Sequence, residues 1–317
     1  MAWPTTVCVM RLGVLDVGSN TVHLLVVDAH LGAHPWPAYS EKHFIRLAEE
    51  IGPDGRLSEA GADALVTAVG NARRAVADLG TDDLLAFATS AVRDATNSGE
   101  VLARVRKETG VDLRVLSGEG EARMTFLAVR RWFGWSAGRI LVIDIGGGSL
   151  EIASGIDEEP DVALSLPLGA GRLARARLPG DPPPPAAVAA LTAYAKERLD
   201  KALRDTDLGK WDRAIATSKT FRTLARLAGA PPSSAGIRIP RQLTRTGLHQ
   251  VLAFIRHIPS TALAEMEGVG ASRAHQLLAG GVVAETVMRR LDIDTLDLCP
   301  WALREGVILR RLDVLES

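Results

Sequence analysis

The sequence predicts a duplicated α/β architecture, and three observations lead to this fold class. Residues 12–29, LGVLDVGSNTVHLLVVDA, have a looser copy at 140–157, ILVIDIGGGSLEIASGID, with Asp16 and Asp144 at equivalent places. Each copy joins two apolar, β-rich runs through a short Gly/Ser turn, which is the pattern of a hairpin. Helical patterns fill the rest of both halves. A chain of 317 residues has room for two such halves, each with its own core.

Serine N-caps and glycine stops mark the helices of the first half. Ser58 precedes a helical pattern that stops at Gly80, and Ser117 precedes another with Gly134 just beyond it. The helices expected along the chain cover residues 59–79, 98–110, 118–133, 186–204, 220–228, 245–257, 271–291 and 301–313. We therefore expect a first domain over 1–125 and a second over 126–317, with the last helix, 301–317, as a candidate for packing back on the first.

Composition and charge favour a soluble cytoplasmic protein. The net charge is −1, so the molecule as a whole has no affinity for a polyanion such as nucleic acid. Two cysteines, Cys8 and Cys299, without a CxxC motif fit a reducing compartment. The N-terminus lacks the basic region of a signal peptide, and no apolar run approaches the roughly 20 residues of a membrane span. Neither a membrane nor a nucleic-acid partner is expected.

Basic residues gather in one segment despite this balance. Residues 172–245 hold 15 Lys and Arg against 6 Asp and Glu. A local basic field of this kind attracts an anionic ligand. The alternative is a set of solvated helix faces.

The two Gly/Ser turns admit three interpretations: a tight turn with no ligand, a dinucleotide loop, or a cradle for phosphate. A dinucleotide loop opens a helix, and β-rich runs follow both turns instead. Glycine allows close backbone approach and positive φ, and successive N–H groups bind anions. Two copies of one turn favour phosphate. The residues that would bind it are Gly18, Ser19, Asn20 and Thr21 in the first turn, and Gly146, Gly147, Gly148 and Ser149 in the second.

An aspartate precedes each turn at the same place. Asp16 and Asp144 would repel phosphate directly. Beside groups that donate hydrogen bonds to phosphate, these carboxylates make most sense as ligands of a divalent cation, directly or through water. The ligand is expected in the cleft between the two halves, where the turns can face each other.

Five motifs together resemble one family of enzymes. They are LDVGSNTVHLLVVD, ATSAVRDATN (88–97), LSGEGEARMTFLAV (116–129), VIDIGGGSLE (142–151) and LREGVI (303–308). In this order they are similar to the exopolyphosphatase/guanosine pentaphosphate phosphohydrolase family, above all to its short actinobacterial exopolyphosphatases. The resemblance implies the duplicated ribonuclease H-like fold of the actin, Hsp70 and sugar kinase superfamily, with two domains and an active-site cleft between them.

The resemblance also implies roles for three further residues. Glu121 matches the proposed general base of the family; by itself, the residue reads as a carboxylate that stabilises a helix N-terminus. Arg93 matches an arginine that pairs with phosphate oxygens, where the alternative is a surface salt bridge. Glu151 matches a glutamate that closes the second turn, and together with Asp144 it is expected to hold Mg²⁺ or Mn²⁺.

Some positions depart from the family pattern. Gly120 replaces an acidic residue in the SGxEEA motif, where a capping box would need it. Lys219 stands where many members have glycine, and it reaches either the polyphosphate chain or solvent; Arg222, in the same motif ATSKTFRTLARLAG, is a second possible polyphosphate contact. None of the seven histidines forms an HxxH or His-Asp pair, so the metal-dependent phosphohydrolase domain of longer members is not expected.

The function expected from these residues is hydrolysis of the terminal phosphoanhydride of short-chain inorganic polyphosphate, by water attack assisted by Glu121 and a divalent metal. The alternative substrate is guanosine pentaphosphate, pppGpp. A kinase of the same superfamily and a non-catalytic polyphosphate sensor are disfavoured by Glu121. Family likeness suggests a homodimer.

Overall fold

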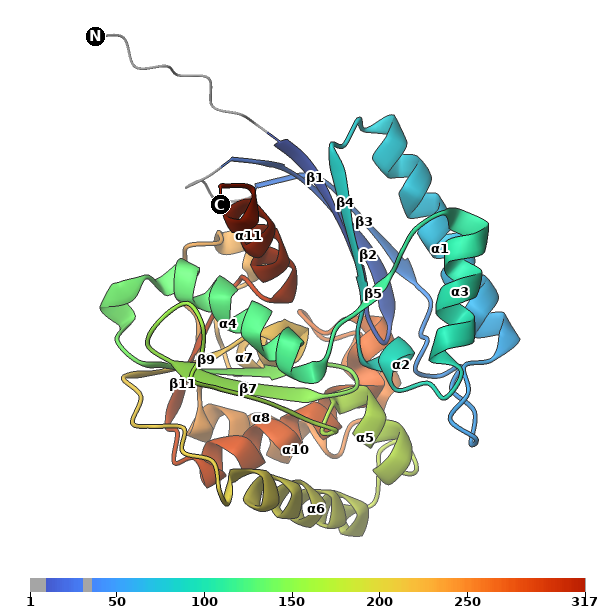
Figure 1. The fold of residues 1–317 in the computed structure, drawn as a ribbon. Coiled ribbons are helices and arrows are strands. Elements are labelled where there is room, and N and C mark those ends of the chain that lie inside the picture. Colours follow the sequence, from blue (N-terminus) through green and yellow to red (C-terminus); the bar gives the residue numbers. More distant parts are fainter. Residues whose placement is uncertain (1–9, 31–35, 317) are drawn as a thin grey trace, which may run out of the picture. The chain divides into compact units, whose positions relative to one another are not determined.

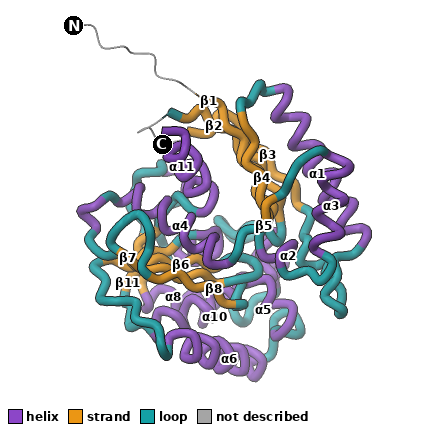
Figure 2. The backbone as a smooth tube through the Cα atoms, in the orientation of Figure 1, coloured by secondary structure: helices purple, strands orange, loops and turns teal. Residues whose placement is uncertain are grey.

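A computed structural model describes residues 10–30 and 36–316 (Figures 1 and 2). Cys8 and the N-terminal segment interpreted above lie outside the described residues. The chain forms two compact units: unit 1 comprises Met1–Ser117 with Arg304–Ser317, and unit 2 comprises Gly118–Leu303. The division falls at the start of a helix, whereas the sequence-based boundary at 125/126 would cut through it.

Unit 1 is built on a five-stranded sheet in the order β3-β2-β1-β4-β5. Strands β1 (Met10–Val17) and β2 (Thr21–Ala29) form the predicted hairpin, and β3 (Trp36–Phe44) adds to it antiparallel. Strands β4 (Asp83–Ala88) and β5 (Arg114–Val115) run parallel to β1 on its other side. The nearly continuous burial of β1 and β2 explains their apolar runs, because a central strand is covered on both faces.

The helices of unit 1 begin and end close to the predicted residues. Helix α1 (Glu59–Asp78) is capped by Ser58, whose hydroxyl accepts a hydrogen bond from the Gly61 N–H at 3.0 Å. Helix α3 (Ser98–Thr109) ends at Gly110, which has the left-handed conformation of a C-cap. Two elements complete the unit: the short helix α2 (Ser90–Arg93) and the last helix, α11 (Leu303–Glu316). The Arg311 guanidinium on α11 contacts the Asp83 carboxylate at 2.9 Å.

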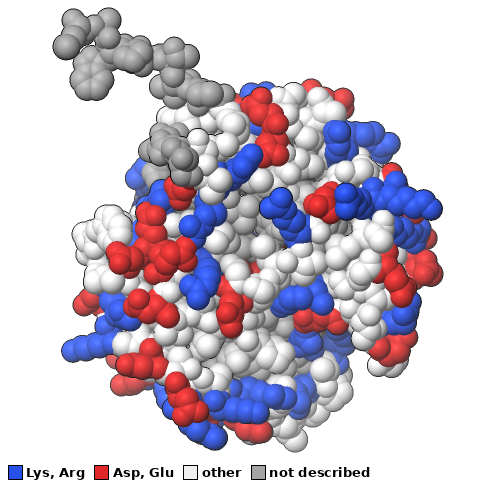
Figure 3. All heavy atoms as spheres, viewed as in Figure 1, with Lys and Arg blue, Asp and Glu red and all other residues white. Residues whose placement is uncertain are grey.

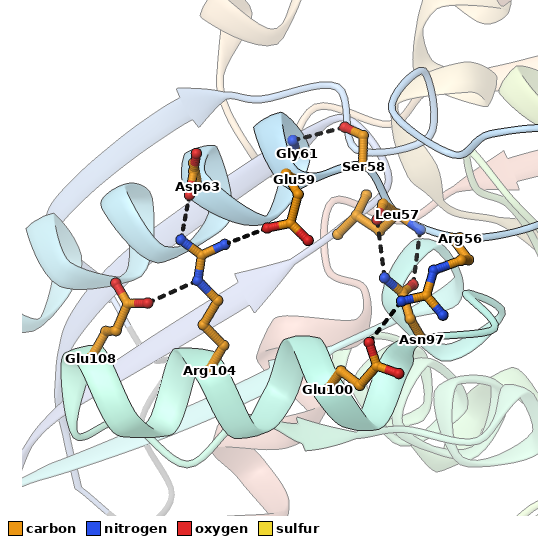
Figure 4. Close-up of polar contacts among 10 residues, drawn as sticks. All are labelled: Arg56, Leu57, Ser58, Glu59, Gly61, Asp63, Asn97, Glu100, Arg104 and Glu108. Atoms are coloured by element: carbon orange, nitrogen blue, oxygen red, sulfur yellow. Dashed lines mark hydrogen bonds and ion pairs between the residues drawn. The ribbon is translucent and has the colours of Figure 1, made fainter.

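Helices α1 and α3 are joined by polar contacts (Figure 4). Arg104 on α3 pairs with Glu59, Asp63 and Glu108, so one guanidinium links both helices. At the start of α3, the Asn97 side-chain amide donates to the Leu57 carbonyl at 3.0 Å and accepts from the Leu57 N–H at 2.8 Å. The buried Asn97 thus braces the loop before α1.

Unit 2 repeats the topology of unit 1 in a six-stranded sheet of order β10-β11-β9-β6-β7-β8. The second hairpin is β6 (Ile140–Ile145) and β7 (Leu150–Gly155), followed by the antiparallel strand β8 (Val162–Leu166). Strands β9 (Arg213–Ala216) and β11 (Thr295–Leu298) run parallel to β6, and β10 (Gln242–Thr244) forms the edge. The common strand pattern of the two sheets confirms the predicted duplication.

Helices cover both faces of the second sheet (Figure 1). Helix α4 (Gly118–Phe133) packs across β6, β7 and β8. On the opposite face, α10 (Ala274–Arg290) is almost entirely buried among α5 (Ala170–Arg177), α6 (Pro185–Leu203) and α8 (Arg245–Ile255). Helix α7 (Ser218–Leu227) packs against α8 and α10, and α9 (Ser260–Ala264) against α10. Among the helices described, none combines the length and the hydrophobicity needed to cross a bilayer.

Arg130 fixes the C-terminal half of α4 to the sheet. Its side chain is 1% exposed and donates to the carbonyls of Gly134, Gly138 and Gly155 at 3.2, 2.8 and 3.2 Å. Burial lowers the pKa of Arg130, while the neighbouring Asp157 acts in the opposite direction. The three carbonyl oxygens accept hydrogen bonds from the guanidinium and so stabilise a positive charge that would otherwise be costly to bury.

We expect Arg130→Met to destabilise the protein by about 2–4 kcal/mol, because one buried and two partly buried carbonyls lose their donor. The measurement is thermal unfolding followed by circular dichroism. Arg131→Met is the matched control: Arg131 is exposed and pairs with Glu158, so its loss should cost about 1 kcal/mol or less. Equal shifts of the two melting temperatures would mean that the buried contacts of Arg130 contribute little.

Candidate active site

The turn between β6 and β7 brings two acidic side chains together. The Gly146 N–H donates to the Ser149 carbonyl at 2.9 Å and closes the turn. Asp144 and Glu151 are direct partners in the antiparallel register. Opposite residues of such a pair project from the same face of the sheet. Both carboxylates therefore lie side by side next to the turn, and Glu151 is only 6% exposed.

The segment at the start of α5 holds this turn from behind. The carbonyls of residues 146 and 147 accept hydrogen bonds from the backbone N–H groups of Ala170 and Arg172, both at 2.9 Å. The carbonyl of residue 148 accepts from the Arg172 Nε at 2.8 Å. In a trans peptide the C=O and N–H groups point in opposite directions. The N–H groups of residues 147–149 therefore point away from α5, as an anion-binding turn requires.

Gly169 is the glycine that this packing demands. A Cβ atom at Gly169 would lie 2.2 Å from the carbonyl carbon of Gly148 and 2.3 Å from the Ser149 nitrogen. By contrast, Gly18 and Gly146 do not have positive φ, and the nearest atom to a Cβ at either would be a carbonyl oxygen at 3.5 Å, an ordinary van der Waals contact. The expectation that glycine supplies a left-handed conformation is thus wrong at these two turn positions. The motif LGAGR at residues 168–172 is the signal that sequence reasoning missed.

The first turn, in unit 1, is built in the same way. The Gly18 N–H donates to the Thr21 carbonyl at 2.9 Å. The Ser19 carbonyl accepts from the Ala48 N–H at 3.0 Å, and the Asn20 carbonyl accepts from two successive N–H groups, those of residues 45 and 46, at 3.2 and 3.1 Å. The carbonyls of this turn also accept hydrogen bonds from a neighbouring backbone segment. The N–H group that follows each of these carbonyls therefore points away from that segment.

Helix α2 lies against the first turn and carries Arg93. The Ser90 hydroxyl, at the start of α2, is 3.0 Å from the Ser19 hydroxyl, and both residues are buried. At the end of the helix, Arg93 donates to the Leu116 carbonyl and to the Asp94 carboxylate, both at 3.1 Å. The structure therefore places α2, which ends at Arg93, beside the first turn within unit 1. The ion pair with Asp94 is the salt bridge that was the alternative interpretation of Arg93.

A second repeat accompanies the two hairpins. The tripeptide ATS occurs at 88–90 and again at 216–218, with the same 128-residue spacing that separates Asp16 from Asp144. In each unit it ends the parallel strand beside the hairpin and begins a helix. Thr217 is fully buried, and its hydroxyl donates to the Asp144 carboxylate. A self-comparison extended beyond the hairpins would have found this element.

Electrostatics couple Glu121 to the same site. Burial raises the pKa of Glu151 well above its ordinary range, and the carboxylates of Glu121 and Asp144 raise it further, while the Ser149 and Ser165 hydroxyls stabilise its charged form. Glu121 lies in the first turn of α4 and is 8% exposed. Three of the predicted acidic residues therefore interact within unit 2.

Asp144 has positive neighbours as well as negative ones. Burial raises the pKa of its carboxyl, and the Thr217 hydrogen bond and the guanidinium groups of Arg222 and Arg273 act in the opposite direction. Arg222 was predicted only as a polyphosphate contact. Arg273 was not singled out from the sequence, because the 3-10 turn that carries it joins the site only in three dimensions.

The residues present fit a divalent cation on chemical grounds. Asp144 and Glu151 are oxygen donors on one face, and their negative charge is costly to bury without a counter-ion. Over residues 10–30 and 36–316, no three His, Cys, Asp or Glu side chains lie close enough together to hold a metal ion. Mg²⁺ is compatible with such a pair, because it often keeps several waters and takes one or two carboxylates together with substrate phosphates.

In unit 1, the strand partner of the aspartate is a histidine rather than a glutamate. Asp16 is the register partner of His23, and His23 is buried with its Nε2 atom 2.8 Å from the Ser40 hydroxyl. The second turn therefore has two carboxylates where the first has a carboxylate and an imidazole.

Lys219 lines a small hollow in unit 2. Arg273, Gln276 and Thr220 are among its other lining residues, and the Thr220 hydroxyl donates to the Ile145 carbonyl at 3.0 Å, beside the second turn. Lys219 itself is exposed. The hollow thus adjoins the turn and carries two basic side chains.

Much of the remaining basic excess of residues 172–245 has structural partners. Lys196, Arg226 and Arg245 pair with carboxylates, and Arg241 donates to four backbone carbonyls. On the face shown in Figure 3, basic and acidic side chains are interspersed. The sequence count alone therefore overstates the basic field.

These features of fold and site match one protein family throughout. The chain belongs to the Ppx/GppA phosphatase family, whose model matches residues 26–315. It is 58% identical over 305 residues to exopolyphosphatase 1 of Mycobacterium tuberculosis, which covers 96% of this chain and 89% of that protein. The guanosine-5'-triphosphate,3'-diphosphate pyrophosphatase of Aeromonas salmonicida is 28% identical, over 93% of this chain and 58% of that protein. The crystal structure of an Aquifex aeolicus Ppx/GppA family member has the same fold, with a TM-score of 0.82 at 24% identity, covering 98% and 99% of the two chains.

Proposed function

We propose that this protein is an exopolyphosphatase that removes the terminal phosphate of linear, short-chain inorganic polyphosphate. One observation carries the proposal: the chain is 58% identical to a mycobacterial exopolyphosphatase over 96% of its length. The second glycine turn, held by the start of α5, and the buried acidic residues beside it support the same chemistry. Phosphoryl transfer to water needs hydrogen-bond donors to the phosphate oxygens, a positioned water and a means of spreading negative charge.

The reaction breaks one P–O bond of a phosphoanhydride. Water attacks the terminal phosphorus, the bond to the bridging oxygen breaks, and the bridging oxygen leaves with the shortened chain. Glu121 orients the attacking water and accepts its proton, which yields inorganic phosphate. The N–H groups of residues 147–149 hold phosphoryl oxygens, with the Ser149 hydroxyl beside them.

A divalent cation, Mg²⁺ or Mn²⁺, would be held by Asp144 and Glu151. When bound, such an ion neutralises charge on phosphate oxygens. Thr217 fixes the orientation of the Asp144 carboxylate through its hydroxyl. Asp16 in unit 1 is proposed as a further cation ligand, directly or through water.

The first turn and Arg93 are proposed to bind further phosphoryl oxygens. The turn contributes Ser19, Asn20 and Thr21 after Gly18, and its carbonyls are engaged as in the second turn. The planar guanidinium of Arg93 suits two phosphate oxygens at once.

The test of this function is a comparison of substrates. Phosphate release is measured on short polyphosphate, long polyphosphate, pppGpp and ATP, each with Mg²⁺ and with a chelator. The highest kcat/KM is expected on short polyphosphate, with loss of activity in chelator. Faster release from pppGpp would instead assign the chain to the guanosine pentaphosphate branch, and faster release from ATP would contradict both assignments.

Lys219→Gln is expected to reduce kcat/KM on long polyphosphate about two- to fivefold and on tripolyphosphate less, because only longer chains reach beyond the turn to the hollow. Lys201→Gln removes the same charge from an exposed position on α6 and serves as control. Equal losses on both substrates, or an equal loss in the control, would show that Lys219 does not contact the chain.

A further inference from the structure

Ser165 lies beside Glu151 on β8, an edge strand of the second sheet. It is the register partner of Glu151 across β7 and β8. Its hydroxyl donates to the Glu151 Oε1 atom at 2.9 Å. Since Glu151 is almost fully buried, this contact limits the directions in which its carboxylate can point.

The first residue of α4 lies directly on Ser165. A Cβ atom at Gly118 would be 2.3 Å from both the Cβ and the Oγ of Ser165. Only a glycine fits this contact without a shift. Glu121 follows three residues later in the same helical turn. One serine side chain is therefore in contact with the strand partner Glu151 and with the start of the helix that carries Glu121.

We propose that Ser165 is a positioning residue, which orients the Glu151 carboxylate for the divalent cation. The proposal rests on the function proposed above, in which Asp144 and Glu151 hold that cation. Two neighbouring carboxylates repel each other, so without a fixed donor each would turn away from its partner. The hydroxyl of Ser165 opposes this by holding the Oε1 atom of Glu151 from the neighbouring strand, while the Ser149 hydroxyl acts on the same carboxylate from the turn. Loss of such an outer hydrogen bond lowers metal affinity about 10- to 100-fold.

Direct Mn²⁺ binding tests the proposal. The metal-free, full-length protein is titrated with MnCl₂, and free Mn²⁺ is measured by electron paramagnetic resonance. Five proteins are compared: wild type, Glu151→Gln, Ser165→Ala, Ser165→Thr and Ser165→Val. Threonine and valine have the same shape beside Gly118 and differ in the hydroxyl, so their difference isolates the hydrogen bond. Thermal unfolding of each variant measures any structural loss separately.

Ser165→Ala and Ser165→Val are expected to weaken Mn²⁺ binding at least about tenfold, and Ser165→Thr to remain within about threefold of wild type. In hydrolysis assays, Ser165→Ala should raise the Mn²⁺ concentration for half-maximal rate more than it lowers the rate at saturating Mn²⁺. Wild-type Mn²⁺ affinity in Ser165→Ala, or equal weakening in the threonine and valine variants, would overturn the positioning role. Wild-type affinity in Glu151→Gln would instead overturn the cation assignment on which the proposal rests.

Discussion

Replacing Glu121 by glutamine is expected to reduce the kcat of polyphosphate hydrolysis by about 10²- to 10⁴-fold. Glutamine keeps the size of the side chain and its hydrogen-bonding oxygen but cannot accept the proton of the attacking water. Affinity for polyphosphate should remain within a few-fold, because the turns and basic side chains that hold phosphate are unchanged. Phosphate release measures the first quantity, and calorimetric titration of the inactive variant measures the second.

Glu119→Gln is the matched control for this experiment. Glu119 lies two residues earlier in the same turn of α4 and is exposed. If Glu121 served only to stabilise the helix N-terminus, both substitutions would lower stability by a similar amount, about 0.3–1 kcal/mol, and neither would abolish turnover. Wild-type turnover in Glu121→Gln would remove the general-base assignment.

Gly169→Ala is expected to lower kcat/KM about 100-fold. The added methyl group would lie 2.2 Å from a backbone carbon of the second turn, and backbone cannot move aside as a flexible side chain can. The turn or the start of α5 must shift. Displacement of the N–H groups that bind phosphate by about 1 Å costs roughly two orders of magnitude in rate. The loss should appear in phosphate affinity as well as in kcat, since the donors bind the ground state too.

Gly99→Ala separates this effect from the general cost of replacing a glycine. Gly99 lies in α3 of unit 1, and a Cβ atom there would meet nothing within 4 Å. Its activity should stay near that of wild type. Phosphate release from short polyphosphate and the melting temperature are measured for both variants. A wild-type kcat/KM in Gly169→Ala would mean that the contact between α5 and the second turn does not hold the phosphate-binding N–H groups in place.

The amino-acid sequence by itself was enough for the duplicated α/β fold and for the two turns. Hairpins and capped helices are local features, and their patterns survive without knowledge of the rest of the chain. The repeated Asp-x-Gly turns also indicated phosphate from the residues alone. Glu121 and Glu151 were different: only the resemblance to a family singled them out, because one glutamate in a helical turn or strand has no distinctive local pattern.

Only the tertiary structure decided what supports these turns. The start of α5 holds the second turn, Thr217 bonds Asp144, and Ser165 bonds Glu151. These contacts join residues from different strands and helices, and sequence spacing does not report which strands become neighbours or in which register. The same reason explains why Gly169, rather than the turn glycine Gly146, is the position where a side chain has no room.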